Sequence, residues 1–328
     1  MARIWVGSFR CIMREHFHLK GLPLEFSLPT RVRWDVDFKG RIGRFKRIAR
    51  QIREIAPQFV ELKIEGDRGI SELSSIVTEI HKCHSKVEAT VRLTAKAVAA
   101  ARWGYPITFL WAIEGDKTFS RCIPRDAQAV SFTADEETIL LLPEVLEDFA
   151  ESRAGELHLP NVNAIRALAA KGHIPVPRPE QIREVSERIA RNPVPLKGKR
   201  LIVHDFFLCR SLRDAFPDEV ENRVEFSGCQ GGTRLAHIDW DGNVYPCDAL
   251  PIRLGNLFET PFERIWRSPA RERVAQAIHA APTDCESSAA DSGCFGGCRG
   301  LATLASGSTD PGKGTRSEEA AASSPKAT

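Results

Sequence analysis

Apolar and polar positions along residues 31–207 follow two alternating periods, which predict strands separated by helices. Short apolar-rich stretches predict strands at residues 31–38, 59–64, 87–93, 107–113, 128–134, 157–159 and 200–207. Apolar stripes with spacings of three and four predict helices at residues 42–55, 70–80, 95–103, 136–151, 162–170 and 180–191. Strands separated in this way predict right-handed βαβ units on a parallel sheet, and six or seven such units predict a partial or full (β/α) barrel.

The pattern changes after residue 222 to short strands and turns. Residues 237–245 contain alternating apolar positions around the pair Asp241–Gly242, which is a strong hairpin signal. This hairpin would deliver Cys247 from the end of its second strand. We expect a turn and two short helices after it, at residues 254–257, 261–266 and about 269–280.

The same region is rich in cysteine. It holds five of the nine cysteines of the chain, namely Cys229, Cys247, Cys285, Cys294 and Cys298. Several glycines lie beside them and leave backbone N–H groups able to point at sulfur. Deprotonated sulfur is the ligand of iron–sulfur clusters and of many zinc sites, so the sequence predicts a metal site here.

The first cysteine group resembles part of the SPASM domain, the C-terminal auxiliary-cluster module of radical S-adenosylmethionine (radical SAM) enzymes that modify peptides. In that family a first cysteine is followed by the motif G-x4-C. Here twelve residues separate Cys229 from Gly242, which begins Gly242-x4-Cys247. The segment GNLFETPFERIWRSP also resembles the family's link between its two cysteine groups.

The second cysteine group resembles the family's C-x2-C-x5-C-x3-C motif with one departure. Cys285, Cys294 and Cys298 fit its first, third and fourth places, while Ser288 stands in the second place. No cysteine follows Cys298, although the family has a final one. Five cysteines cannot supply two complete clusters, so the resemblance implies one [4Fe-4S] cluster. In the family's pattern it would be held by Cys229, Cys247, Cys298 and either Cys285 or Cys294.

The expected barrel is also the architecture of radical SAM enzymes, and two of their motifs are missing. The family places C-x3-C-x2-C after its first strand, whereas residues 39–46 contain no cysteine. The family's GGEP motif is replaced by Ile64-Glu65-Gly66-Asp67. The resemblance therefore implies a partial (β/α)6-type TIM barrel of the radical SAM kind that lacks the catalytic cluster, so S-adenosylmethionine binding is not expected.

A barrel without radical SAM cysteines, joined to a SPASM-like segment, resembles the SPASM-domain proteins of GeoRSP (geopeptide-type) peptide-maturation systems. The phrases RVRWDVDF, VSFTADEET and LPEVLEDF are similar to that group. This resemblance implies a non-catalytic partner of a radical SAM/SPASM maturase that acts on a ribosomally made precursor peptide. Two alternatives stay open: an active radical SAM-type enzyme with non-standard ligands, and a structural zinc protein, because four thiolates also suit tetrahedral zinc.

Composition narrows the class of partner. The chain has 328 residues, 27% of them charged, with a formal net charge of +3, which indicates neither nucleic acid nor a membrane surface. No apolar run is as long as a membrane-spanning helix, and no secretion signal is recognisable. Nine cysteines without such a signal predict a location in the reducing cytoplasm, where clustered thiols bind metal more often than they form disulfides.

These observations predict four segments. We expect a flexible N-terminus at residues 1–21, a radical SAM-like barrel at 22–222, a SPASM-like iron–sulfur domain at 223–304 and a disordered tail at 305–328.

Other residues that could carry chemistry have simpler interpretations. The basic residues around 39–53 predict a solvated helical face. We interpret His81, Cys83 and His84, and likewise His204 and Asp205, as packing residues rather than as a zinc site or an acid/base pair.

Overall fold

The computed structural model describes residues 28–37, 42–65, 70–83, 85–91, 107–113, 123, 127–204, 208–221, 229–279, 298 and 300. These residues form a mixed α/β fold with a parallel sheet at its centre, which confirms the expected fold class. The expected helix at 95–103 and the two chain ends at 1–21 and 305–328 lie outside the described residues.

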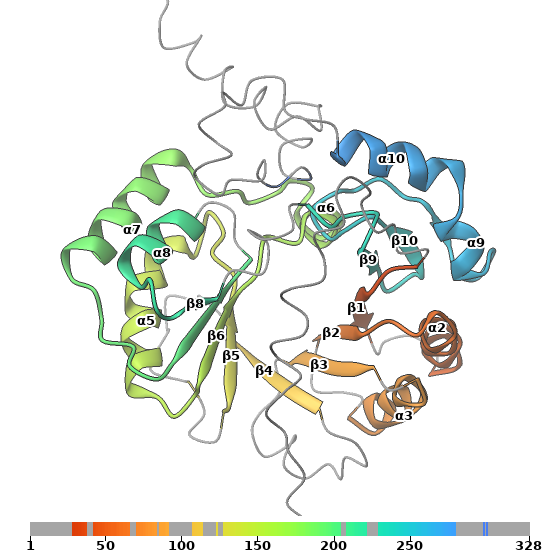
Figure 1. Cartoon of the computed structure of the whole chain (residues 1–328), viewed down its shortest axis with the longest axis horizontal. Helices are drawn as coiled ribbons and strands as arrows, with labels where there is room; N and C mark the ends of the chain where they lie inside the picture. Colours follow the sequence, from red (N-terminus) through yellow and green to blue (C-terminus); the bar gives the residue numbers. More distant parts are fainter. Residues whose placement is uncertain are drawn as a thin grey trace, which may run out of the picture.

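Eight strands from the first part of the chain run parallel in the order of the sequence, with helices between most of them (Figure 1). The strands are β1 (Arg31–Asp37), β2 (Phe59–Glu65), β3 (Lys86–Val91), β4 (Ile107–Ile113), β5 (Ala129–Phe132), β6 (Glu156–Leu159), β7 (Arg200–Val203) and β8 (Val220–Glu221). The helices are α2 (Ile42–Ile55), α3 (Ile70–His81), α5 (Leu142–Glu151), α6 (Ala164–Lys171), α7 (Pro179–Arg191) and α8 (Cys209–Ala215), and the 3-10 turn η1 (Ile139–Leu141) precedes α5.

The cysteine-rich region extends the same sheet. Its elements are β9 (Leu235–Ile238), β10 (Asn243–Tyr245), β11 (Gly255–Asn256), α9 (Phe262–Trp266) and α10 (Pro269–His279). Strand β9 pairs in parallel with β1, with Arg31 opposite Leu235 and Trp34 opposite Ile238. Strands β10 and β11 continue antiparallel, giving the order β11-β10-β9-β1-β2-β3-β4-β5-β6-β7-β8. The sheet is curved but open, and one sheet runs through both expected domains (Figure 1).

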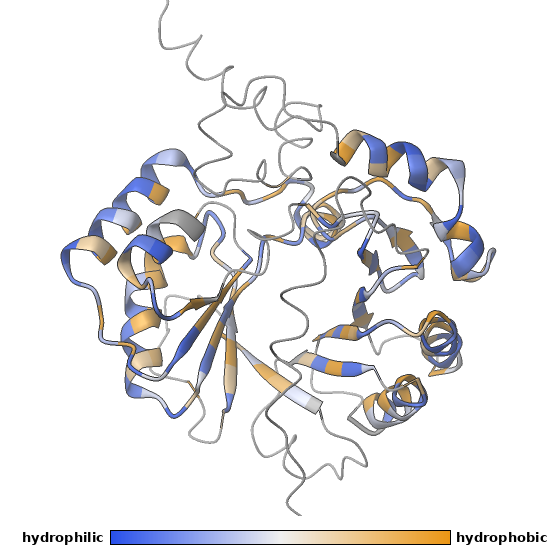
Figure 2. Ribbon diagram, viewed as in Figure 1, coloured by the Kyte–Doolittle hydropathy of each residue, from blue (hydrophilic) through white to orange (hydrophobic). Residues whose placement is uncertain are grey.

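The hydrophobic core lies between the strands and the helices on their outer side. Along β1, Val32, Trp34 and Val36 are fully buried in this layer, and the ring of Trp34 lies 6.3 Å from that of Phe45 on α2. Because side chains alternate along a strand, the residues between them project from the opposite, inner face of the sheet. Hydrophobic and hydrophilic bands accordingly alternate along the strands (Figure 2).

The inner face of the sheet near β1 is therefore polar, and a capping residue connects it to α6. The side-chain oxygen of Asn163 accepts a hydrogen bond from the backbone N–H of Arg166 at 3.0 Å, which caps the helix. The side-chain nitrogen of the same Asn163 donates to Asp35 on β1 at 3.0 Å. The start of α6 is thus fixed against the inner face of the first strand.

The structure departs from the sequence expectations in two places. Residues 254–257 were expected to form a turn, but Gly255 and Asn256 pair with β10 as strand β11. Neither α8 nor β8 was expected, because both are too short to give a periodic signal. The basic face of α2 is exposed as expected, and the guanidinium groups of Arg44 and Arg47 lie 4.6 and 5.3 Å from the ring centroid of Phe258. None of the described helices has the length and apolar content needed to cross a bilayer.

Candidate metal centre

The hairpin that leads to Cys247 is built around the side chain of Asp239. Its Oδ1 accepts hydrogen bonds from the backbone N–H groups of Asp241 and Asn243 at 2.9 and 2.8 Å. Its Oδ2 accepts from the Asn243 amide and the Tyr245 hydroxyl at 2.8 and 3.1 Å. This arrangement confirms the expected hairpin, and it shows that Asp239 serves the turn.

The turn also requires glycine. Gly242 has φ of 78°, in the left-handed region, and a Cβ at this position would lie 2.7 Å from the ring of Phe258. Strand β10 ends at Tyr245, so Cys247 follows the hairpin by two residues. The G-x4-C motif is therefore a compact turn that fixes where the cysteine leaves the sheet.

Three of the five expected ligands come together beside this hairpin. Cys247 is buried with Leu235, Ala249, Leu250 and Ile278, and Cys229 and Cys298 pack against the same group. All three side chains are thiols and none of them forms a disulfide. The structure therefore brings Cys229, Cys247 and Cys298 together, although Cys298 is more than fifty residues from Cys247 in the sequence.

Two glycines allow the segments that carry these cysteines to approach one another. A Cβ on Gly231 would lie 3.6 Å from the Sγ atom of Cys247, so the chain just after Cys229 passes directly beside that sulfur. A Cβ on Gly300 would lie only 2.6 Å from the carbonyl carbon and oxygen of Ala249, closer than any real Cβ contact. The backbone after Cys298 therefore lies against the backbone after Cys247, and only glycine fits there.

The remaining two candidate ligands, Cys285 and Cys294, lie outside the described residues, as does Ser288. Among the described residues, no three His, Cys, Asp or Glu side chains are close enough to hold a single metal ion. Three clustered thiols still fit an iron–sulfur cluster, because its ligands bind different iron atoms and are spaced more widely than those of one ion.

The electrostatic surroundings of Cys247 favour a cationic occupant. Burial raises the pKa of the Cys247 thiol well above its usual value, and the nearby Cys229, Asp248 and Cys298 raise it further. A thiolate is therefore costly here unless a positive centre compensates it. Binding of iron or zinc would supply that charge and displace the proton.

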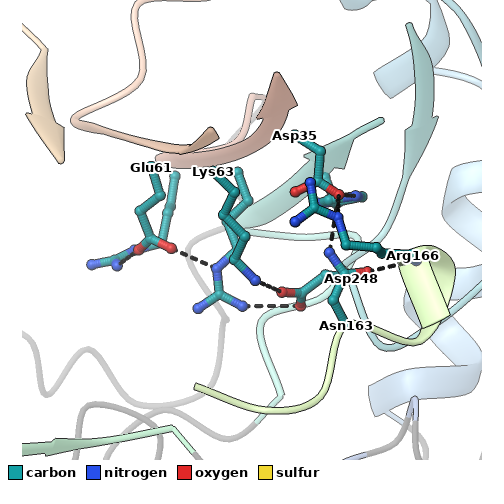
Figure 3. Close-up of polar contacts among 9 residues, drawn as sticks. Asp35, Glu61, Lys63, Asn163, Arg166 and Asp248 are labelled. Atoms are coloured by element: carbon teal, nitrogen blue, oxygen red, sulfur yellow. Dashed lines mark hydrogen bonds and ion pairs between the residues drawn. The ribbon is translucent and has the colours of Figure 1, made fainter. Parts of the chain in front are cut away.

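A buried polar network, not foreseen from the sequence, surrounds Asp248, the residue that follows Cys247 in the sequence (Figure 3). The carboxylate of Asp248 accepts hydrogen bonds from Arg33 on β1 at 3.0 Å and from Lys63 on β2 at 3.2 Å. Arg33 also donates to Glu61 at 2.6 Å, and Glu61 forms a second ion pair with Arg31. These residues lie on the inner face of the sheet, so the network connects the barrel strands to the residue after Cys247.

A second part of the network surrounds Asp35 (Figure 3). Besides Asn163, its Oδ2 atom faces Nε2 of His237 on β9 at 3.4 Å and Nε of Arg166 at 3.9 Å. Asp35 and His237 are both fully buried. Within the described part of the chain, the other carboxylate oxygen of Asp35 and Nδ1 of His237 have no hydrogen-bond partner.

Charge pairing keeps these buried acids ionised. Burial alone would raise the pKa of Asp248, but Arg33 and Lys63 lower it below its usual value. Burial opposes ionisation of Glu61 in the same way, and Arg33 and Arg31 lower the pKa of that carboxyl. The alternation of charged and apolar residues in RVRWDVD and FVELKIE is the signal that could have indicated a charged inner face.

The other candidate residues are described only in part. The thiol of Cys83 contacts the backbone oxygen of Ile80 and the hydroxyl of Ser85, both at 3.0 Å, which agrees with a packing role. His84 and Asp205 lie outside the described residues, so the pairs that include them are not tested. Burial, with the Arg33 cation nearby, lowers the pKa of His204 to about 3. His204 is therefore a neutral side chain near the network.

The chain matches one known protein family over part of its length. Residues 229–294 match the SPASM family, an iron–sulfur cluster-binding domain. This range includes Cys229, Cys247, Cys285 and Cys294. The match agrees with the converging thiols of the structure and assigns iron–sulfur binding to this part of the chain.

Solved structures with the same fold include proteins that bind S-adenosylmethionine. A structure titled native anSMEcpe with bound AdoMet has a TM-score of 0.57 at 12% identity and covers 88% of this chain and 95% of its own. Streptococcus suis SuiB bound to S-adenosylmethionine has a TM-score of 0.54 at 12% identity, with 84% of this chain and 74% of SuiB covered. At this identity the likeness shows the fold alone.

Two curated relatives match short stretches, and both are described as AdoMet-dependent heme synthase. The protein of Methanosarcina barkeri is 44% identical over 41 residues, 12% of each chain. The protein of Nitratidesulfovibrio vulgaris is 34% identical over 91 residues, 28% of this chain and 24% of its own. The matched stretches thus span less than a quarter of either relative. The chain carries a SPASM iron–sulfur cluster-binding domain on the mixed α/β, parallel-sheet fold of radical SAM enzymes.

Proposed function

We propose that this protein is a non-catalytic iron–sulfur protein that assists a radical SAM/SPASM maturase in modifying a ribosomally made precursor peptide. The observation that carries the proposal is the convergence of Cys229, Cys247 and Cys298 within and beside a SPASM domain. Cys285 or Cys294 would complete the ligand set of one [4Fe-4S] cluster. Such a cluster supplies one-electron transfer.

The inner face of the barrel supports a non-catalytic role. Arg31, Arg33 and Lys63 are engaged by Glu61 and Asp248, so the charged groups of β1 and β2 are committed to one another. Residues 39–46, where radical SAM enzymes carry their cluster ligands, contain no cysteine. In this proposal the barrel holds the SPASM domain and presents a surface to the maturase, and it does not cleave S-adenosylmethionine.

A peptide as the substrate of the partner is supported by the structural neighbours. SuiB has been solved with its precursor peptide SuiA, and anSMEcpe with a peptide, each with AdoMet in at least one structure. The chain shares their fold at 11–12% identity, so the substrate class is carried over as a proposal.

Metal analysis tests the first half of the proposal. The protein is purified without oxygen, and iron, sulfide and zinc are measured per chain together with the visible spectrum. About four irons and four sulfides are expected, with loss in Cys247→Ala but not in Cys83→Ala, a cysteine outside the site. One zinc without iron would overturn the proposal in favour of a structural zinc protein, whose thiolate site is colourless.

A reconstituted reaction tests the accessory role. The protein is added to a radical SAM/SPASM maturase and its precursor peptide, and peptide modification is followed by mass spectrometry. We expect faster modification with the wild-type protein than with Cys247→Ala, and no S-adenosylmethionine cleavage by the protein alone. Cleavage by the isolated protein would instead favour an active enzyme, the alternative suggested by AdoMet-bound neighbours and by relatives described as AdoMet-dependent heme synthases.

A further inference from the structure

Asp248 is the residue through which the barrel reaches the metal centre. It directly follows Cys247 and is 2% exposed. Arg33 binds one carboxylate oxygen at 3.0 Å and Lys63 binds the other at 3.2 Å. Both cations come from barrel strands, whereas Asp248 belongs to the SPASM domain, so each contact spans at least 185 residues of sequence. We call Arg33, Asp248 and Lys63 the barrel bridge.

The barrel bridge holds its geometry through further contacts. Arg33 is anchored on its other side by Glu61, and the Glu61 carboxylate is shared with Arg31. The backbone oxygen of Asp248 lies 3.4 Å from the backbone N–H of Ile165 on α6. The peptide unit after Cys247 is thus held from three elements, β1, β2 and α6, and a buried charge pair of this kind is sensitive to removal of either partner.

The charges of the barrel bridge and its ion-pair partners do not cancel. Arg33 and Lys63 bring two positive charges to the single carboxylate of Asp248, and Glu61 is shared between Arg31 and Arg33. One positive charge therefore remains in excess across these five side chains. A thiolate-bound cluster is anionic and becomes more so on reduction, and nearby positive charge stabilises the reduced form.

We propose that Arg33 and Lys63 are positioning residues of the metal centre, which hold the segment after Cys247 in place through Asp248 and make its reduction potential less negative. This inference rests on the proposed function, because it assumes that the thiols bind an iron–sulfur cluster. It assigns to the barrel a task that requires no catalysis. The barrel sets the electrostatic environment of the electron-transfer site.

Two substitutions of opposite charge separate this role from a merely structural one. Lys63→Met removes a positive charge, and the reduction potential should become more negative. Asp248→Asn removes a negative charge, and the potential should become more positive. Loosening of the site would move both variants in the same direction, because each change would expose the cluster to water in the same way.

Two control variants test whether the shift comes from the charge at position 63. Lys171→Met breaks a surface ion pair with Glu137 of similar length, 2.9 Å, and should leave the potential unchanged. Lys63→Arg keeps the charge and should stay close to wild type. The potentials are measured by electron paramagnetic resonance during redox titration. Shifts of the same sign in Lys63→Met and Asp248→Asn, or no difference between Lys63→Met and Lys171→Met, would overturn the inference.

A metal-free readout distinguishes failure of this inference from failure of the proposed function. If the wild-type protein contains no iron, the proposed function fails, and the barrel bridge is tested on the apoprotein. The rate of alkylation at Cys247 is followed by peptide mass spectrometry. Lys63→Met should slow it, because the Asp248 carboxylate beside Cys247 loses one of its two compensating cations, and Asp248→Asn should accelerate it. Equal rates in the two variants would show that the barrel bridge has no electrostatic effect on this sulfur.

Discussion

Gly300, two residues after Cys298, lies against the backbone of Ala249, and a substitution at Gly300 tests whether this contact positions Cys298. A methyl group on Gly300 would lie 2.6 Å from the carbonyl carbon and oxygen of Ala249, whereas ordinary contacts begin at 3.4 Å. The two backbone segments would have to separate by about 0.8 Å, which exceeds the roughly 0.5 Å within which a functional constellation must be held. Gly300→Ala should therefore displace Cys298 from Cys247 and remove most of the bound iron.

The expected cost to folding is moderate. Overpacking by one methyl group typically costs about 1–3 kcal/mol, so the variant should still fold. Iron and sulfide per chain are measured after anaerobic purification, and the stability of the metal-free protein by urea denaturation. Gly43→Ala is the matched control, since Gly43 is an exposed residue of α2 and a methyl group there would meet no atom within 4 Å. Full iron content in Gly300→Ala would refute the view that this backbone contact positions Cys298.

Three further predictions concern the hairpin, the barrel and the core. Asp239→Ala leaves the hydrogen-bond donors of Asn243 and Tyr245 without their acceptor. It should lower the free energy of unfolding, measured by urea denaturation, by about 2–4 kcal/mol. A change below about 0.5 kcal/mol would contradict the role of Asp239 in the turn. The pKa of His204 is lowered from 6.5 in the unfolded chain to about 3 in the folded protein, so between these values the unfolded chain binds one proton more. The free energy of unfolding should therefore fall as the pH drops below about 6.5, and it should fall less steeply in His204→Gln. Urea unfolding at a series of pH values from about pH 7 to about pH 5 would measure both slopes. Phe149→Ala removes a fully buried ring and should cost about 3–5 kcal/mol, whereas Phe258→Ala, with a partly buried ring, should cost less in the same assay.

The order of strands and helices could be predicted because each element carries its own period. The stripe of Phe45, Ile48 and Ile52 on α2, for example, is buried as a set. Short elements carry no such period and were missed. Gly255 and Asn256, for example, form a strand only because β10 lies beside them. Whether so short a segment forms a strand depends on its pairing with another strand, and the residues of the segment themselves do not reveal that pairing.

The candidate site was only partly predictable. The spacing of Cys229 and Cys247 around a glycine turn indicated the metal centre, and the structure brings both to Cys298. The partners of Asp248 could not be foreseen, because Arg33 and Lys63 meet it only after the barrel strands and the SPASM domain share one sheet. Contacts across 185 or more residues follow from topology rather than from spacing.

The parallel pairing of β9 with β1 has a consequence for how this protein could evolve. The hairpin before Cys247 is built directly on the first strand of the barrel, so its backbone partners are barrel residues such as Arg31 and Arg33. A shortened descendant without the barrel would leave one side of β9 unpaired and exposed to aggregation. Selection on the cysteine-rich region alone would therefore preserve the barrel as its foundation, even in a lineage that no longer needs the barrel's chemistry.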